Sequence, residues 1–314
     1  MSRSATSVAT RRSVITFALW LLIAIYAAAR ILQVSPGKVP TLEVVALHVL
    51  PPLLFALIHG AMYYRARGIL AFVAISVVVG GVFEYVGVRT GFPFGHYYFT
   101  ALMGPKLSVV PILLGLAYVG MGYLSWILAV VILGGMRNPI SGSRVVTMPL
   151  IAAFIMLAWD WSMDPVWSTV LRAWIWLDGG AYFGVPVTNF LGWYLTVYVI
   201  YQLFALFLQG RSIESLPLAG FYWRQAVLFY AVSAAGNILL ALPQPGPNAV
   251  SDPSGAQWRV HDITAATALV SIFVMGGFAL VAWFRLADRE TGETPVAPLI
   301  TRPWSAPRET ARGR

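Results

Sequence analysis

The sequence predicts an all-α membrane protein, a polytopic transmembrane helical bundle of about eight spanning helices. Hydrophobic residues make up 59% of the 314 positions and charged residues only 11%, and the mean hydropathy is +0.75. Soluble domains contain about 25% charged residues. Apolar stretches close to the roughly 20 residues needed to cross a bilayer also recur along the whole chain. Composition and spacing therefore agree on a multi-pass membrane protein.

Eight apolar stretches can be assigned, at about 14–32, 41–62, 68–88, 107–135, 147–163, 186–209, 222–242 and 263–286. The first is compatible with a signal peptide, because Arg11 and Arg12 precede an apolar run that ends in alanines. An uncleaved first helix is the usual arrangement in multi-pass chains. Residues 288–314 are rich in Pro, Thr, Arg and Glu, which predicts a disordered cytoplasmic tail after a single transmembrane domain, 1–287.

The distribution of basic residues predicts the orientation of the chain in the cell membrane. If the N-terminus is cytoplasmic, fifteen of the 21 Lys and Arg residues fall on the cytoplasmic side, in accordance with the positive-inside rule. We therefore expect both termini in the cytoplasm and no nucleic-acid partner, although the formal net charge is +9. The sequence contains no cysteine, which excludes disulfides, thiolate metal sites and cysteine nucleophiles.

Three acidic residues, Glu84, Asp160 and Asp164, lie inside or at the ends of spanning stretches. An ionisable side chain at membrane depth costs about 2.5–3.5 kcal/mol on insertion scales, so acids in such places need partners or a function. Glu84 is about four residues from the end of its span, roughly 6 Å below the membrane surface. The predicted topology places all three acids near the outer face, where they can form one shallow site.

Asp160 and Asp164 are four residues apart, which places both carboxyl groups on one helical face, and Pro165 predicts that the helix ends there. Of two carboxyl groups in an aromatic, poorly hydrated site, one that stays neutral can donate a proton in general acid catalysis. The alternative is structural, with the acids paired to Arg89, Arg172 or backbone groups.

An aromatic segment rich in Gly and Pro follows each acidic stretch. Residues 91–98 read GFPFGHYY, which rules out a continued helix and suits a folded cap at the membrane surface. After Asp164, the residues around Asp178-Gly179 predict a short hairpin or re-entrant turn. An ordinary interfacial belt of aromatic residues explains the same composition.

The four histidines do not indicate a metal site. His96 lies in the aromatic cap, where it is a second-tier candidate for assisting proton transfer. His48 and His59 fall in the second stretch, eleven residues apart, and we expect them to form hydrogen bonds between helices. The sequence contains no nucleotide-binding loop and no acidic motif of the kind that holds a metal-diphosphate. We expect no metal and no cofactor.

Two blocks of residues resemble a known family. One runs from Phe83-Glu84-Tyr85 through GFPFGHYY to Gly104, Lys106 and Val110-Pro111; the other comprises Asp160, Met163-Asp164-Pro165, Trp174, Trp176, YFGVP at 182–186, Asn189-Phe190 and Gly192-Trp193. With the helix pattern, they cover most of residues 40–210. They are similar to the integral-membrane carotenoid biosynthesis proteins that include bisanhydrobacterioruberin hydratases and carotenoid 1,2-hydratases.

The resemblance implies a hydro-lyase that adds water to the terminal C=C of an acyclic, psi-end carotenoid, giving a tertiary alcohol without a cofactor. Its substrate would lie in the bilayer, with other enzymes of the carotenoid pathway as candidate partners. Under this hypothesis Glu84 and Asp164 form the acid and base pair, and Asp160 tunes them or shares their proton. The candidates for positioning water or substrate, or for walling a cation, are Phe94, His96, Tyr97, Tyr98, Trp161, Trp167, Tyr182 and Asn189.

Two alternatives of other classes remain open. Intramembrane acids also mark proton-coupled transporters, which usually place them near the membrane midplane on broken helices. A non-catalytic carrier that presents a lipid or isoprenoid to other enzymes would keep a pocket and tolerate neutral replacements of the acids. Replacing Glu84 with Gln distinguishes the enzyme from the carrier.

Overall fold

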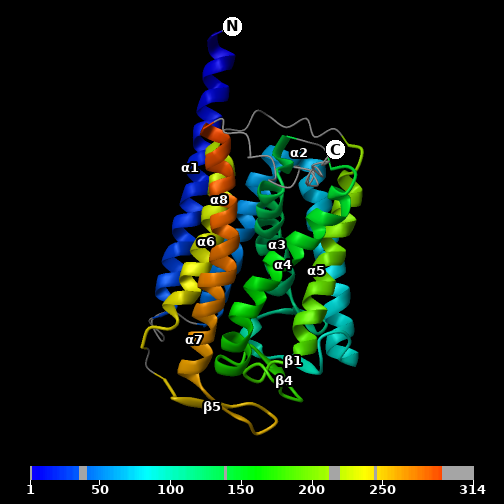
Figure 1. Cartoon of the computed structure of the whole chain (residues 1–314), viewed down its shortest axis with the longest axis vertical. Helices are drawn as coiled ribbons and strands as arrows, with labels where there is room; N and C mark the ends of the chain where they lie inside the picture. Colours follow the sequence, from blue (N-terminus) through cyan, green and yellow to red (C-terminus); the bar gives the residue numbers. More distant parts are fainter. Residues whose placement is uncertain (1, 35–40, 138–139, 212–219, 244–245, 292–314) are drawn as a thin grey trace, which may run out of the picture.

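The computed structural model describes residues 2–34, 41–137, 140–211, 220–243 and 246–291. The helices are α1 (Ser2–Leu32), α2 (Thr41–Thr90), α3 (Ile112–Ile132), α4 (Arg144–Pro165), α5 (Val187–Leu208), α6 (Gly220–Leu239), α7 (Val260–Val270) and α8 (Gly276–Thr291). Figure 1 shows the helices along the long axis of the molecule, with α7 and α8 end to end. The last helix ends a short way inside the segment predicted as a disordered tail, and residues 292–314 lie outside the described residues.

Within the described part of the chain, six helical segments are long and apolar enough to cross a membrane: Ser13–Leu32, Leu42–Thr90, Ile112–Ile132, Arg144–Val170, Val187–Leu208 and Val260–Asp288. The last of these joins α7 and α8 through the π-helix η4 (Ser271–Met275). The predicted polytopic helical bundle is therefore confirmed, whereas the number of eight crossings stays a prediction.

Helix α2 is longer than one crossing requires. It consists of two helices that meet at Arg65, whose φ of 58° and ψ of 175° are not helical. The chain reverses direction there. The close approach of the two halves shows this, since a Cβ atom on Gly60 would come within 2.5 Å of the side chain of Ile69. In a straight helix these residues would be about 13 Å apart along the axis.

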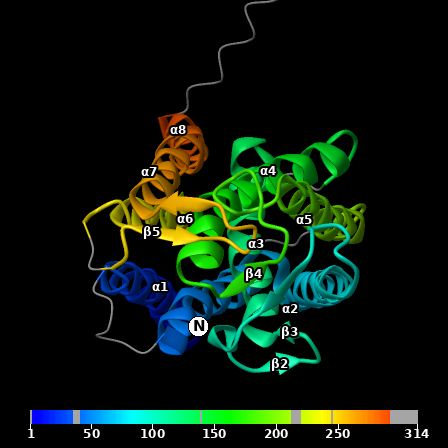
Figure 2. The same ribbon diagram turned by 90° about the horizontal axis from the view of Figure 1, so that it is seen from below.

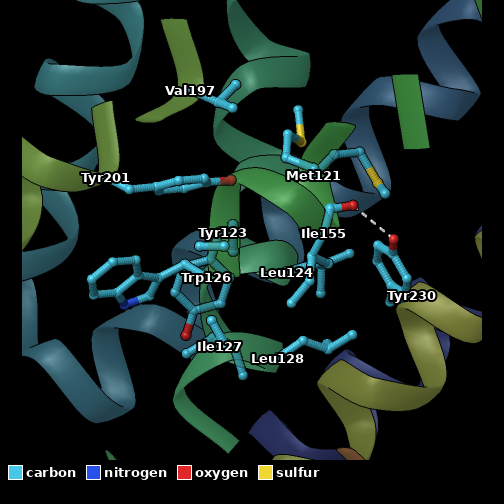
Figure 3. Packing of buried hydrophobic residues seen from close by; sticks show 14 of the residues in the cluster. Met121, Tyr123, Leu124, Trp126, Ile127, Leu128, Ile155, Val197, Tyr201 and Tyr230 are labelled. Carbon is cyan, nitrogen blue, oxygen red and sulfur yellow. Dashed lines mark hydrogen bonds between the residues drawn. The ribbon is translucent and has the colours of Figure 1, made fainter. Parts of the chain in front are cut away.

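Helix α3 lies at the centre of the bundle, and most of its residues are buried. Figure 3 shows its side chains packed between those of neighbouring helices. Polar contacts add to this packing, since Tyr230 donates a hydrogen bond to the carbonyl oxygen of Ile155 at 2.8 Å. Trp126 likewise donates to the hydroxyl of Tyr64 at 2.7 Å. Helices in lipid associate through such close packing and interhelical hydrogen bonds.

The outer surface of the bundle exposes large apolar side chains. Phe17 on α1, Val78 on α2, Leu191 on α5 and Phe273 on η4 are all at least 63% exposed. Apolar side chains spread over several helices in this way are expected of a bundle that is surrounded by lipid. The interior, in contrast, holds the polar side chains described below.

His59 confirms the expectation of hydrogen bonds between helices. Its Nδ1 lies 2.7 Å from the hydroxyl of Tyr123 on α3, and its Nε2 lies 2.9 Å from the carbonyl oxygen of Tyr222 on α6. His48 makes a similar contact, with its Nε2 3.0 Å from the side-chain oxygen of Gln33. Both rings therefore link helices.

Short strands cover one end of the bundle (Figure 2). They form three antiparallel pairs: β1 (Tyr97–Phe99) with β4 (Trp174–Trp176), β2 (Lys106–Leu107) with β3 (Val110–Pro111), and β5 (Ala249–Ser251) with β6 (Gln257–Arg259). Two single-turn 3₁₀ helices, η1 (Ala101–Met103) and η2 (Gly135–Arg137), complete the described elements together with the π-helix η3 (Val166–Val170).

The predicted hairpin around Asp178-Gly179 is wrong. Strand β4, which precedes that turn, pairs with β1 from the first aromatic segment, and Tyr97 faces Trp176 across the pair. The turn itself leads only to an isolated bridge between Tyr182 and Val185. Local turn chemistry favoured a hairpin, but the pairing with a distant strand buries Tyr97, Trp174 and Trp176 against the bundle.

Candidate active site

Glu84 is buried in the second half of α2, with 3% of its surface exposed. Tyr97 of β1 donates a hydrogen bond to its Oε2 at 2.5 Å, and Tyr118 of α3 donates to its Oε1 at 2.7 Å. A Cβ atom on Gly80 would lie 3.1 Å from the ring of Tyr118, so the glycine leaves room for that ring. Two hydroxyl groups thus hold both oxygens of one carboxyl group.

Asp164 lies one residue before the end of α4 and is equally buried. Its Oδ1 accepts hydrogen bonds from the indole N–H groups of Trp174 at 3.0 Å and Trp176 at 3.4 Å. Its Oδ2 accepts from the amide of Asn189, at the start of α5, at 2.6 Å. The two tryptophans are two residues apart on β4, which places both indoles on the same side of the strand.

Asp160 lies one helical turn before Asp164 and is 1% exposed. Among the described residues, neither of its carboxyl oxygens has a hydrogen-bond partner of standard geometry. Its electrostatic neighbours are Asp164 and Glu84, and the amide of Asn189 lies nearby. The amide oxygen of Asn189 also lacks a partner within the described part of the chain. The site thus contains one carboxyl group and one amide oxygen with free hydrogen-bonding capacity.

A small cavity of about 20 Å³ lies beside these groups. Of the three carboxyl groups, only that of Glu84 lines it, together with Asn189 and aromatic side chains that include Phe94 and Trp193. A volume of this size holds about one water molecule. Asp164 lies behind the side chains of Asn189, Trp174 and Trp176, which themselves form part of the wall.

A second, mainly apolar cavity of about 60 Å³ adjoins the first. The two cavities share Leu114, Met163 and Trp174 as lining residues. The wall of the larger cavity also includes Arg30 and His48, which form its polar corner. An apolar ligand in the larger cavity can therefore extend one end toward Glu84.

Two glycines allow the aromatic cap to pack against the helices. A Cβ atom on Gly87 would lie 2.6 Å from the ring of Phe94 and 2.9 Å from the hydroxyl of Tyr97. A Cβ atom on Gly192 would lie 2.8 Å from the other side of the Phe94 ring. Such distances are too short for a real Cβ atom, so both positions require glycine for the cap to seat Tyr97 on Glu84.

The comparison with protein families identifies the chain. The model of the carotenoid biosynthesis protein family matches residues 43–250, more than half of the 314 residues. The chain belongs to the carotenoid biosynthesis protein family. The matched region contains Glu84, Asp160 and Asp164 and both strands of the β1–β4 pair.

A bisanhydrobacterioruberin hydratase from Haloarcula japonica is 32% identical to this carotenoid biosynthesis protein over 139 residues. That match covers 44% of this chain and 45% of the relative, so it spans less than half of the relative's length. No solved structure matches the chain. Family membership and the apolar helices together make it a membrane protein of carotenoid biosynthesis.

Several residues that the sequence predicted for the site come together in this family member. Phe94 lines the small cavity, Tyr97 binds Glu84, and Asn189 binds Asp164. Trp167 lies farther out, in the wall of the apolar cavity, with its ring 5.7 Å from that of His48. These four side chains come from segments that are far apart in the sequence.

Four other predicted residues lie outside both cavities. His96 is exposed and its Nδ1 lies 2.8 Å from a carboxyl oxygen of Asp178. Tyr98 is 48% exposed, because neighbouring residues of a strand point to opposite sides. Trp161 is 39% exposed, with its ring centroid 6.1 Å from that of Tyr182. Tyr182 lines neither cavity and makes no hydrogen bond to the carboxyl cluster of Glu84, Asp160 and Asp164. Burial raises the pKa of its phenol to about 12.

Sequence reasoning did not select Tyr118, Trp174, Trp176 or Trp193 as site residues. Tyr118 carries a hydroxyl within an apolar span, where such a group seeks a hydrogen-bond partner on another helix. Trp174 and Trp176 show the two-residue spacing of a strand with one buried face. Within the described residues, no group of three or more His, Asp and Glu side chains has the arrangement of a metal site.

Proposed function

We propose that this protein adds water to a terminal carbon–carbon double bond of an acyclic carotenoid and so forms a tertiary alcohol. The observation that carries the proposal is a buried carboxyl group, Glu84, on the wall of a water-sized cavity that shares three lining residues with an apolar one. Hydration of an alkene needs a proton donor, a water molecule and an apolar binding site, and these three features coincide here. The name of the Haloarcula relative supports the same chemistry.

Glu84 is the group that exchanges a proton with the substrate, since the other two carboxyl groups do not reach the cavity wall. In its neutral form it donates its proton to the terminal alkene, which produces a tertiary carbocation and leaves a carboxylate. The hydroxyls of Tyr97 and Tyr118 stabilise this carboxylate as its charge develops. Their two hydrogen bonds therefore stabilise mainly the transition state and the intermediate, in which Glu84 carries a negative charge.

Water adds to the cation in the second step. The free amide oxygen of Asn189 accepts a hydrogen bond from the water molecule in the small cavity and so orients its lone pair toward the cation. The water oxygen then forms the new C–O bond and releases a proton to the carboxylate of Glu84, which restores the neutral acid. The aromatic faces of Phe94, Trp174 and Trp193 stabilise the cation between the two steps.

Asp164 and Asp160 act through other residues. Asp164 positions Asn189 and both indoles of β4 through three hydrogen bonds. Asp160 stays neutral, because a buried charge without a hydrogen-bond partner is strongly unfavourable. Its retained proton limits the negative charge of the cluster before and after turnover. This assignment refines the predicted acid and base pair of Glu84 and Asp164.

The proposal also specifies the orientation of the protein. The strands that cover the site belong to the outer membrane face, and both termini are cytoplasmic, as the distribution of basic residues predicts. A reporter that is active only in the cytoplasm, fused after residue 291, gives a signal if this orientation is correct. A signal only from a reporter that works outside the cytoplasm would reverse the topology and place the site on the inner face.

The direct test is expression in a host that makes lycopene or another psi-end carotenoid, followed by chromatography and mass detection of the pigments. We expect a product heavier by one water molecule from the wild type and at least about a 100-fold loss in Glu84→Gln, the usual size of an acid–base contribution. Asp160→Asn is the matched control. It removes a carboxyl group from the same cluster but keeps its shape and neutral state, so it retains most of the activity.

The outcomes separate the possible functions. Unchanged pigments with well-expressed wild-type protein, across several psi-end substrates, would contradict hydration and favour transport or a carrier role. An active Glu84→Gln variant would remove Glu84 from the proton-transfer step. Equal losses in Glu84→Gln and Asp160→Asn would show that Asp160 also transfers a proton.

A further inference from the structure

A third cavity, larger than the two beside the carboxyl groups, lies outside the proposed active site, on the side of the β1–β4 pair that carries Tyr98 and Ile175. It has a volume of about 300 Å³, and the neighbouring loops and the β5–β6 hairpin form its walls. The polar residues in its lining are Ser168, Thr169, Arg172, Ser251 and Asp252. A larger share of its wall is polar than in the cavity proposed to hold the carotenoid, and we call it the polar cavity.

The β1–β4 pair separates this polar cavity from the carboxyl cluster. Tyr97, Trp174 and Trp176 are on the buried side of the pair, whereas Tyr98 and Ile175 are on the other side and line the polar cavity. Trp176 lines both the polar cavity and the small cavity beside Glu84. Trp176 thus lies between the two cavities.

Ser168 makes a second connection between the polar cavity and the cluster. It lies in the π-helix η3, directly after the end of α4, and its hydroxyl donates a hydrogen bond to the main-chain oxygen of Asp164 at 2.8 Å. Single π-helical turns occur frequently at functional sites. The hydrogen bond from Trp176 to Asp164, at 3.4 Å, is the longest of the three that the carboxyl group of Asp164 accepts. The longest hydrogen bond to this carboxyl group therefore comes from Trp176, the residue that also lines the polar cavity.

We propose that this polar cavity is the vestibule through which the water substrate reaches the carboxyl cluster, passing between Ser168 and the indole of Trp176. The inference rests on the proposed hydration, which consumes one water molecule per turnover. The small cavity holds about one water molecule, so it must be refilled after each reaction. The carotenoid occupies the apolar cavity during turnover, which leaves the polar cavity as the route from solvent. The carotenoid and water therefore enter from opposite sides of Glu84.

The absence of cysteine from the chain makes the vestibule testable by labelling of single introduced thiols. Membranes that contain the Ser168→Cys variant, with the proposed outer face of the protein toward the solution, are treated with a small, charged, membrane-impermeant thiol reagent. Ser125→Cys is the matched control, because Ser125 is fully buried in α3 and bonds to the main-chain oxygen of Met121. We expect the thiol at position 168 to react at least about tenfold faster, because Ser168, although 3% exposed, lines the polar cavity, whereas Ser125 lines neither this cavity nor the two beside the carboxyl groups.

Hydration activity is measured before and after labelling, with the untreated variant as the reference. A bulky adduct at position 168 is expected to lower hydration at least about tenfold, a loss equivalent to 1.4 kcal/mol. Ile175→Cys, on the vestibule side of β4, repeats the experiment if Ser168→Cys does not fold. Thiols at positions 168 and 175 that react no faster than the control would overturn the vestibule, as would complete labelling without loss of activity.

The experiment distinguishes failure of the vestibule from failure of the proposed function. Labelling reports access of water whether or not the protein is a hydratase. If the untreated wild type gives no hydrated product while position 168 reacts rapidly, the proposed reaction fails and the cavity is not a route for the water of hydration. If the wild type is active and position 168 is unreactive, only the route is wrong.

Discussion

At the scale of single residues, the two tyrosines that bind Glu84 distinguish this carboxyl group from its neighbours. A hydrogen bond to a charged group contributes about 1.5–3 kcal/mol, more than a bond between neutral groups. If the charge on Glu84 appears only after it donates a proton, this contribution accelerates the reaction and adds little to the stability of the resting protein. The hydroxyls of Tyr97 and Tyr118 are therefore expected to affect rate more than stability.

Replacing Tyr118 with Phe removes one hydroxyl and leaves the ring, which stacks on Trp193 with centroids 4.6 Å apart. We expect hydration to fall about 10- to 100-fold, which corresponds to the loss of one hydrogen bond to a charged oxygen. Product formation per unit of folded protein in membranes measures the effect.

Tyr201→Phe is the matched control for this prediction. Tyr201 is equally buried, and its hydroxyl donates to the main-chain oxygen of Gly122 at 3.0 Å, away from the carboxyl groups. Its replacement is expected to lower stability by about 1 kcal/mol and to leave the specific activity unchanged. Similar losses of activity in both variants would mean that Tyr118 supports the bundle in general and not Glu84.

The residue scale also shows what the sequence can predict about the site. Glu84, Asp160 and Asp164 stand out because acids are unfavourable in apolar spans, a property that each residue shows in its own neighbourhood. Their donors Tyr118 and Asn189 come from other helices, so their contacts depend on how the helices pack. His96 was predicted from its chemistry and its place in the aromatic segment. Side chains of an extended chain point alternately to opposite sides, however, which leaves His96 exposed beside Asp178.

At the scale of elements, the β1–β4 pair carries one of the two donors to Glu84 and two of the three donors to the carboxyl group of Asp164. Leu177 donates a main-chain hydrogen bond to His96, and Thr100 donates one to Ala173. By the alternation of an antiparallel pair, Tyr98 and Ile175 between them form a hydrogen-bonded pair. Proline at position 175 lacks the N–H group that this pair requires.

We expect Ile175→Pro to open the β1–β4 pair and to lower hydration at least about 100-fold, since misplacing a catalytic contact by about 1 Å has an effect of that size. Ile175→Val keeps the N–H group and the strand propensity, and we expect it to retain activity. Pigment analysis of both variants, with protein amounts measured in membranes, provides the comparison. Full activity in Ile175→Pro would show that the pair does not position the donors.

The β5–β6 hairpin depends on the charge of Asp252. Burial tends to raise the pKa of Asp252, but hydrogen bonds from Ser254, Trp258 and the main chain of Ala256 outweigh it and hold the pKa below its ordinary value. The ionised form is thus favoured in the folded hairpin. Its stabilising effect is present above the pKa of the unfolded chain, 3.8, and is lost as the pH falls through the lower folded value.

We therefore expect protease cleavage of the 249–259 hairpin to increase as the pH falls below about 4, and Asp252→Asn to remove this pH dependence. An acid-active protease and mass analysis of the fragments measure the rate at each pH. The same pH profile in wild type and Asp252→Asn would assign the change to another group.

At the scale of the whole molecule, a buried cation joins three helices. Arg30 of α1 donates hydrogen bonds to the side-chain oxygen of Asn237 and the main-chain oxygen of Ser233, both on α6. Asn237 in turn donates to the hydroxyl of Ser162 on α4 at 2.7 Å. This chain of polar contacts crosses the bundle near the apolar cavity, to whose wall Arg30 belongs.

Asn237→Leu removes one acceptor from the buried Arg30, and we expect it to lower the stability of the bundle by about 1.5–3 kcal/mol. Thermal unfolding in detergent measures the change. Thr267→Val is the matched control, because its buried hydroxyl has no partner in the described part of the chain and its loss should change stability little. Equal stability of both variants would show that Arg30 does not depend on Asn237.

The helical bundle follows from the sequence because its signal is repeated in every span and does not depend on distant contacts. The reversal at Arg65 is visible as a short polar break between two apolar stretches. The β1–β4 pair has no such signal, since three-residue strands are too short for a recognisable pattern and each finds its partner in another segment. Turn residues at Asp178-Gly179 predicted a local pairing that the burial of three aromatic rings overrides.

The position of Tyr97 opposite Trp176 has a consequence for how the protein loses activity. The ring centroids of these residues are 4.8 Å apart, and one of them binds Glu84 while the other binds Asp164. A local opening of this small ribbon withdraws both donors together, although the helices around it remain folded. Opening of the ribbon thus removes Tyr97 from Glu84 and the indoles of β4 from Asp164 in one step. On heating, the protein should therefore lose activity while the bundle, which still holds Tyr118 and Asn189 in place, remains folded.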